Sequence, residues 1–116
     1  MNMTRDEIEN MSSGREMDAL IAERVLGLKV DYEFEGFGGL RVPSLVDKYD
    51  EWGYLPDYST DISAVWQVIE KLKEHKPLLN YDPYSKKWYM CFNGAPFYSA
   101  ETAPLAICRA ALLTRL

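Results

Sequence analysis

The chain has 116 residues, of which 47% are hydrophobic and 27% are charged, and its formal net charge is −5. This length holds one domain with one core, and this composition excludes disordered and fibrous proteins. An acidic chain disfavours nucleic acid as a partner, because that affinity comes largely from Lys and Arg on phosphates. No apolar run approaches the roughly 20 residues of a membrane helix, and "MNMTRDEIEN" lacks the basic and apolar parts of a signal peptide. We therefore expect a single domain over 1–116 that works in the cytosol and not in a membrane.

The N-terminal segment predicts two helical pieces. Thr4 with Glu7, and Ser13 with Glu16, each fit a capping box at a helix start. The longer piece, a helix over about 14–26, carries apolar residues on one stripe: Met17, Leu20, Ile21 and Val25. The polar positions between them should face solvent: Glu16, Asp18, Glu23 and Arg24.

After Gly27, a good helix stop, the period changes. "KVDYEFEG" alternates apolar and acidic residues, which predicts a half-buried strand. The turn "GFGG" (36–39) follows, and three acids before it argue against a phosphate loop. The segment 40–56 is irregular but too apolar for a linker, so we expect an ordered excursion with a short helical turn. The whole irregular and strand excursion covers 29–58.

The second half predicts a helix, short strands and a last helix. Apolar residues at 3-4 spacing predict a helix over 60–75, which Pro77 blocks. "PLLNY", "KWYMCF" and "FYS" predict short strands within 78–99, and a nearly all-apolar helix spans 101–114. This order predicts an α+β fold, a small α-β-α sandwich whose short, mostly antiparallel sheet has helices packed on its faces. The N-terminal helix is the candidate cover for the second face.

Two carboxylates, Asp57 and Asp61, stand before the helix over 60–75. They could bind a metal or act as an acid–base pair, and either of them could work with His75. The alternative is capping, with Ser59 as the cap and Asp61 in the first turn. The strings "YSTDIS" and "YSAETA" share one pattern and both precede a helix. This repetition favours capping, and we expect no catalytic residues.

The remaining candidates are a cation and several aromatic residues. Arg109 is the one charge in the middle of an apolar helix, so it either pairs or snorkels, or forms the floor of an anion pocket. Aromatic residues of the excursion could stack on a ligand or form an interface. The ligand or partner candidates are Trp52, Tyr54, Tyr58, Asp57 and Arg109.

No metal or cofactor is expected. The acidic positions of the first strand, Asp31, Glu33 and Glu35, have no adjacent His or further carboxylate to complete a ligand set. Cys91 and Cys108 each lie in an apolar stretch, which predicts buried, reduced thiols without a metal motif.

Three stretches carry a family resemblance: "MTRDEIENMSSGREMDALIAERVLG", "PDYSTDISAVWQVIEKL" and "SAETAPLAICRAALL". In this order they resemble the small phage and prophage proteins of the phage ABA sandwich domain family, most specifically through "TAPLAICRAALL". The resemblance implies an α-β-α sandwich. The family tends to carry Trp after the glycine that ends the first helix, where this chain has Leu28, and 29–55 match no family pattern. The resemblance implies no catalytic or binding residues.

These observations leave three functional hypotheses. The first is a non-enzymatic phage or prophage accessory protein in the bacterial cytosol that binds a protein partner through the aromatic excursion. The second is a protein that binds or sequesters a small, nucleotide-like ligand through Arg109 and the aromatics. The third is an enzyme that uses Asp57 or Asp61 with His75. The double-stranded RNA-binding domain shares the late helix–strands–helix order, but "SAETAP" lacks the lysines which that module needs. The apolar last helix would also allow a homodimer.

Overall fold

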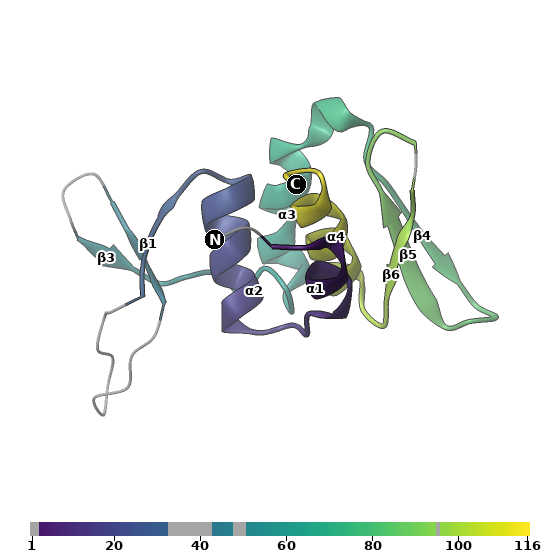
Figure 1. Ribbon diagram of the computed structural model, residues 1–116, viewed down its shortest axis with the longest axis horizontal. Helices are drawn as coiled ribbons and strands as arrows, with labels where there is room; N and C mark the ends of the chain where they lie inside the picture. Colours follow the sequence, from purple (N-terminus) through teal and green to yellow (C-terminus); the bar gives the residue numbers. More distant parts are fainter. Residues whose placement is uncertain (1–2, 33–42, 48–50, 95) are drawn as a thin grey trace.

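Helices occupy the middle of the molecule, and a small sheet lies toward each end of its long axis (Figure 1). The computed structural model describes residues 3–32, 43–47, 51–94 and 96–116. The elements are α1 (Arg5–Asn10), α2 (Arg15–Leu20), the π-helical turn η1 (Ile21–Val25), β1 (Lys29–Asp31), β2 (Ser44–Val46), β3 (Trp52–Gly53), α3 (Ile62–Lys71), the 3-10 turn η3 (Lys73–His75), β4 (Leu78–Asp82), β5 (Lys87–Cys91), β6 (Tyr98–Ala100) and α4 (Ala103–Leu113).

Helix α4 is the centre of the core because it is apolar on nearly every side. It contacts β5 and β6 on one side, and α1, η1 and α3 elsewhere. Its buried residues are Ala103, Pro104, Ala106, Ile107, Cys108, Ala110, Ala111 and Leu112. Small alanine side chains let neighbouring elements approach closely, and the burial of Ile107 and Leu112 favours the folded state through the hydrophobic effect.

The β4–β6 sheet is antiparallel with β5 in the middle, as the sequence predicts. Met90 pairs with Leu79 on β4 and with Tyr98 on β6. Because successive strand residues face opposite sides, Met90 and Phe92 point together into the core, where both are buried. Cys91, between them, is buried and free, as is Cys108. Both thiols therefore match the expectation.

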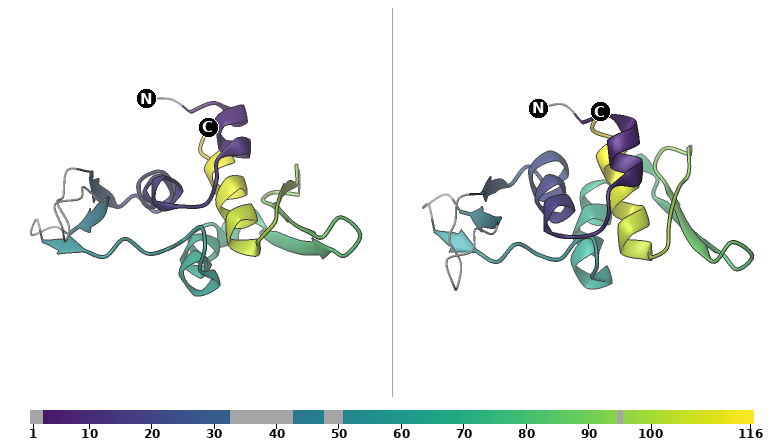
Figure 2. Two further views of the ribbon diagram at one scale, coloured as in Figure 1. Left: turned by 90° about the horizontal axis from the view of Figure 1, so that it is seen from below. Right: turned by 60° about the horizontal axis from the view of Figure 1, so that its bottom comes forward.

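The structure confirms the α+β class and the small sandwich of short antiparallel strands and packed helices. The N-terminal helices do not cover the second face of the β4–β6 sheet; α1 and η1 pack on α4 instead (Figure 2). Strand alternation gives that second face polar positions such as Asn80, Lys87 and Ser99. The apolar flanks of α4 offer the N-terminal helices more hydrophobic surface, which explains the arrangement.

The segment predicted as an irregular excursion instead contributes two strands. β1, β2 and β3 form a second antiparallel sheet, in which Leu45 pairs with Val30 on one side and Gly53 on the other. Pro43 breaks the sequence pattern, yet it stands just before β2, where its missing N–H costs no ladder bond. The predicted strand residues Glu33 and Glu35, and the turn over 36–39, lie outside the described residues.

Of the three predicted helix caps, the structure contains one and replaces the other two with different capping residues. The Thr4–Glu7 capping box is present. The Ser13–Glu16 box is not, because Gly14 is the N-cap of α2 and makes no side-chain cap bond. Gly14 has φ 149°, in the region that favours glycine, so the chain turns there before a Ser13 cap can form.

The entry to α3 also differs from the prediction. Asp61, not Ser59, is the N-cap, and its carboxylate accepts a hydrogen bond from Ser63 N at 2.9 Å. Helix α4 is capped by Thr102, whose hydroxyl accepts from Leu105 N. The repeated pattern therefore marks two capped helices, but the capping position shifts by one residue between them.

The burial of Asp18 is the main difference from the prediction in the first half of the chain. The sequence places it on the solvent side of the helix over 14–26, whereas it is only 1% exposed in the structure. The helix ends at Gly27 as predicted, with φ 69°. Asp18 is buried because the chain before α3 packs against α2 and gives its carboxylate hydrogen-bond donors.

Candidate functional site

Two exposed aromatic residues mark a hollow beside β3. Trp52 is 59% exposed and Tyr54 is 72% exposed, although large aromatic side chains are usually buried. They stand two residues apart along an extended chain, which directs both side chains to the same side. The hollow has a volume of about 470 Å³ and is lined by Arg15, Pro43, Ser44, Trp52, Gly53, Tyr54, Leu55 and Asp57.

Arg15 lines this hollow and contacts three acceptors. Its Nη1 lies 2.5 Å from Asp57 Oδ1 and 3.2 Å from Asp18 Oδ2, and its Nη2 donates to the Leu55 carbonyl at 2.6 Å. Helix α2 is thereby joined to the segment that follows β3. A guanidinium group has a planar fork of donors, which suits contacts with several acceptors at once.

Tyr54 is held from two directions. Its hydroxyl donates to Asp57 Oδ2 at 2.8 Å, and the Arg15 guanidinium carbon lies 5.1 Å from the centre of its ring. The hydrogen bond to Asp57 is the main cause that raises the pKa of Tyr54 above its usual value. Asp57 therefore positions Arg15 and Tyr54, and the aromatic ring is fixed although it is exposed.

The same network continues into the core. Asp18 Oδ1 accepts hydrogen bonds from the Ser59 amide at 2.8 Å and from the Ser59 hydroxyl at 2.7 Å. The Ser59 hydroxyl in turn accepts from Gly14 N at 2.9 Å. Ser59 is fully buried, so these contacts satisfy polar groups that water cannot reach. The start of α2 and the chain before α3 thus form a rigid support for the hollow.

Tyr58, a predicted ligand or partner candidate, belongs to the core instead. Its side chain is completely buried, and its hydroxyl has no hydrogen-bond partner among the described residues. Burial, with a smaller contribution from the charge of Asp18, raises the pKa of Tyr58. No ligand can reach this ring while the chain is folded, because it lies between the helices rather than on the excursion surface.

Arg109 lies apart from the aromatic hollow. Its Nη2 donates to the Met11 carbonyl at 2.9 Å and its Nη1 to the Ser99 carbonyl at 3.0 Å. Burial lowers the pKa of Arg109, and nearby Glu101 opposes this effect. Arg109 therefore ties the α1–α2 connection to β6, and it also lines a polar hollow of about 320 Å³ with Ser12, Ser13, Lys87, Ser99, Ala100, Glu101 and Leu105.

The predicted pairing of Asp57 or Asp61 with His75 does not assemble. Asp61 caps the start of α3, and His75 lies beyond its end. The ten residues of α3 separate them by about 15 Å, which is far beyond hydrogen-bond reach. Asp57 lines the aromatic hollow, whereas His75 lines a different one. Among the described residues no three His, Cys, Asp or Glu side chains gather as a metal site would require.

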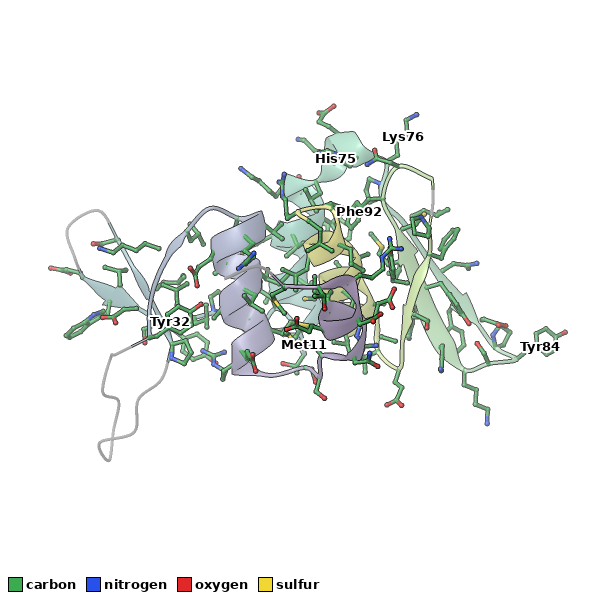
Figure 3. All side chains as sticks on the ribbon, viewed as in Figure 1. Met11, Tyr32, His75, Lys76, Tyr84 and Phe92 are labelled. Atoms are coloured by element: carbon green, nitrogen blue, oxygen red, sulfur yellow. The ribbon has the colours of Figure 1, made fainter. Side chains whose placement is uncertain are left out.

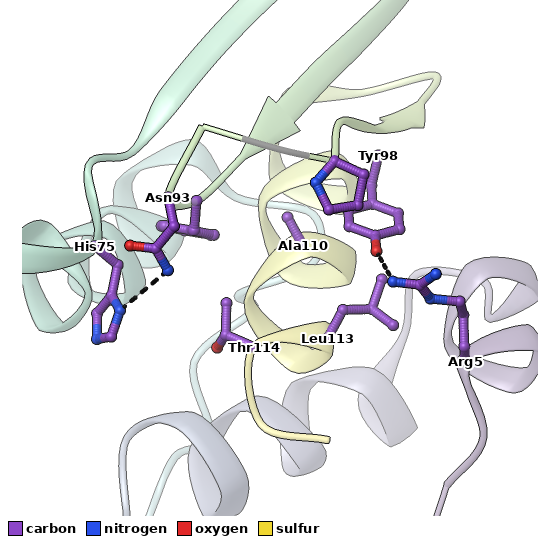
Figure 4. Close-up of a pocket in the computed structure, with 9 residues that line it drawn as sticks. Arg5, His75, Asn93, Tyr98, Ala110, Leu113 and Thr114 are labelled. Atoms are coloured by element: carbon purple, nitrogen blue, oxygen red, sulfur yellow. Dashed lines mark hydrogen bonds between the residues drawn. The ribbon is translucent and has the colours of Figure 1, made fainter.

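His75 instead lines a separate hollow at the C-terminal end of α4 (Figure 4). Asn93 and the Arg5–Tyr98 pair line the same hollow. Sequence reasoning missed this group and the role of Arg15, because their residues come from distant segments. Arg5 and Tyr98 are 93 residues apart in the sequence, so no local pattern indicates their contact. Asn93 is the exception, because "NG" is typical of turns and predicts the positive φ, 63°, that Asn93 adopts.

Comparisons with known proteins agree with this fold. No described helix has the length and apolar character to span a membrane. Comparison with curated proteins gives no significant match. The chain is similar to a phage protein from Bacillus cereus ATCC 14579 of known crystal structure, with 27% sequence identity and a TM-score of 0.73 over 90% of this chain and 89% of that one. The model of the phage ABA sandwich domain matches residues 19–112. Because that match covers most of its length, the chain belongs to the phage ABA sandwich domain family.

Proposed function

We propose that this chain is a non-enzymatic phage or prophage accessory protein that binds a protein partner in the bacterial cytosol. One observation carries the proposal: exposed Trp52 and Tyr54 stand beside Arg15 around one hollow. Trp, Tyr and Arg are the residue types enriched where a few side chains supply most of the binding energy of an interface.

The rigidity of the support strengthens this proposal. Tyr54 is fixed by Asp57 and Arg15, and Arg15 is fixed by Asp18 and the Leu55 carbonyl. Little side-chain entropy is then lost when a partner binds, which favours affinity. The matching occupant is an apolar or aromatic side chain of the partner, seated between the two exposed rings with its main chain near β3.

The test removes both aromatic side chains and compares the result with a matched removal elsewhere. The variant Trp52→Ala/Tyr54→Ala should fold normally and lose at least about a hundredfold in affinity for a partner purified from infected cells, measured by calorimetry. The control Trp66→Ala/Tyr84→Ala removes the same two kinds of side chain elsewhere. Trp66 lies on α3 and is 55% exposed. Tyr84 lies in the β4–β5 turn and is 95% exposed (Figure 3). Equal loss in both variants, or unchanged binding in the first, contradicts the proposal.

A second candidate function is binding of a small, nucleotide-like ligand. It rests on the polar hollow that Arg109, Lys87 and three serines line. Glu101 in the same lining means that such a ligand must carry hydrogen-bond donors as well as an anionic group. A thermal-shift screen with nucleotides separates the two functions: stabilisation that Lys87→Gln abolishes and Trp52→Ala/Tyr54→Ala retains supports the small ligand, and no shift with any nucleotide rejects it.

A further inference from the structure

We propose that the hollow at the C-terminal end of α4 binds a phosphate group carried by a small ligand. The hollow has a volume of about 250 Å³ and lies between two polar pairs, His75 with Asn93 and Arg5 with Tyr98 (Figure 4). The side of the hollow formed by α4 carries Ala110, Leu113 and Thr114. This site shares no residue with the aromatic hollow around β3.

The Arg5–Tyr98 pair presents donors. Arg5 Nη2 donates to the Tyr98 hydroxyl at 2.5 Å, and the Arg5 guanidinium also lies 5.6 Å from the centre of the Tyr98 ring. Because that hydroxyl accepts from Arg5, its own proton stays available to a ligand. Within the described part of the chain Arg5 forms no salt bridge, so its other N–H groups are not occupied by a carboxylate.

The His75–Asn93 pair adds one donor and one acceptor, because Asn93 keeps its second amide hydrogen and its carbonyl oxygen. Asn93 Nδ2 lies 3.4 Å from His75 Nδ1, so with the amide donating, the imidazole proton resides on Nε2. Asn93 N donates to the His75 carbonyl at 2.6 Å, which fixes the two residues relative to each other. Thr114 adds no free donor, since its hydroxyl donates to the Ala111 carbonyl. The free donors around the hollow are therefore the remaining Arg5 N–H groups, the Tyr98 hydroxyl and the second amide hydrogen of Asn93, and they match the acceptor oxygens of a phosphate.

The charge of the lining points to the same ligand. None of its residues is Asp or Glu, in a chain whose net charge is −5. The C-terminal end of α4 carries a partial negative charge that opposes an anion. That effect is reduced here, because Thr114 N and Arg115 N donate to the Ala110, Ala111 and Leu112 carbonyls. Arginine then supplies the geometry that suits a phosphate.

The remaining lining limits the size of the ligand. Phe92, Pro96 and Leu113 form the apolar part of the hollow. Drug-sized ligands occupy pockets of roughly 300–1,000 Å³, so about 250 Å³ fits a phosphate with a small apolar substituent. A phosphate monoester of this size is the class of ligand that the contacts and the volume favour.

The experiment titrates the full chain with inorganic phosphate and with phenyl phosphate at constant ionic strength, and follows backbone amide shifts by NMR. We expect saturable shifts at Asn93, Tyr98 and Leu113. Arg5→Gln should weaken binding at least about tenfold, because it removes a charge-assisted contact. Lys71→Gln makes the same charge change on the exposed side of α3 and should leave binding unchanged.

A second variant separates binding from folding. Asn93→Gly removes the amide and keeps a backbone that φ 63° suits, so stability should stay and phosphate affinity should fall severalfold. Shifts that do not saturate, shifts confined to other surfaces, or equal effects of Arg5→Gln and Lys71→Gln overturn the proposal. A fall in melting temperature with unchanged phosphate affinity in Arg5→Gln assigns Arg5 a purely structural role and overturns it too.

Discussion

The two small sheets share a topology but differ in what holds them to the rest of the molecule. Both are three-stranded and antiparallel, with the strands in chain order. The β4–β6 sheet gives the core fully buried side chains such as Met90 and packs directly on α4. The β1–β3 sheet gives it only the half-buried Val30 and Leu45. The chain after β3 is held by the polar contacts of Arg15.

The two sheets therefore divide stability and exposed aromatic side chains between the two ends of the molecule. Hydrophobic burial scales with the apolar area removed from water, so the β4–β6 sheet should contribute most to stability. The β1–β3 sheet keeps its aromatic residues Trp52 and Tyr54 exposed. A region that stabilises the fold little can present such side chains to a partner without weakening the core.

The largest loss of stability is expected when one apolar side chain is shortened in each sheet and the two losses are compared. Met90→Ala should lower the free energy of unfolding by about 2–5 kcal/mol, because it leaves a cavity beside α4. Leu45→Ala should cost less than about 1.5 kcal/mol, because this side chain is only half-buried. Urea unfolding followed by circular dichroism measures both values. An equal loss at the two positions would mean that the two sheets stabilise the fold to the same extent.

A smaller effect is expected from the polar contacts that support the β1–β3 end. Asp18→Ala should cost about 2–4 kcal/mol, because it leaves the buried Ser59 amide and hydroxyl without an acceptor. Asp57→Ala removes the other carboxylate on Arg15, but at a half-exposed position, and should cost less than about 1 kcal/mol. The same urea titration tests the pair, and a larger loss for Asp57→Ala than for Asp18→Ala would show that the buried contacts do not anchor this end.

The sequence predicts the parts of the fold that depend on local periodicity. Helix α4 and the strands around Met90 follow from their apolar patterns. The burial of Asp18 does not, because helical spacing places it on a polar face and only the packing of Ser59 against α2 reverses this. Likewise the β1–β3 sheet depends on pairing between segments that Pro43 interrupts. Local patterns cannot report which distant backbone will supply a donor or a strand.

The residues of the candidate site also differ in whether the sequence predicts them. Trp52 and Tyr54 could be predicted, because large aromatic residues in a segment without clear periodicity indicate a surface. Tyr58 is a candidate from the sequence whose side chain is fully buried, since a side chain just before a helix can point into the core or out of it. Arg15 also lines the hollow, but nothing in the sequence predicts this apart from its place at a helix start.

The smallest effect we expect is a shift in the pKa of Tyr54, which reports on its hydrogen bond to Asp57. The Tyr54 hydroxyl donates to Asp57, so the folded state favours the neutral phenol and the pKa of Tyr54 lies above the ordinary value of 10.0. This contribution to stability is present below pH 10.0 and is lost as the pH rises through the higher folded-state pKa. The difference in tyrosinate absorbance between the natural chain and Tyr54→Phe isolates this one phenol among the eight tyrosines.

Asp57→Asn should move that midpoint back toward 10.0, because it removes the charged acceptor. Asp6→Asn, which removes an exposed carboxylate in the first turn of α1, should leave the midpoint in place. A Tyr54 midpoint at the ordinary value in the natural chain would mean that the ring is not held by Asp57 in solution. The exposed Tyr54 ring would then be mobile, and the support that its fixed position gives to partner binding at the β1–β3 end would be lost, while the β4–β6 end stayed as described.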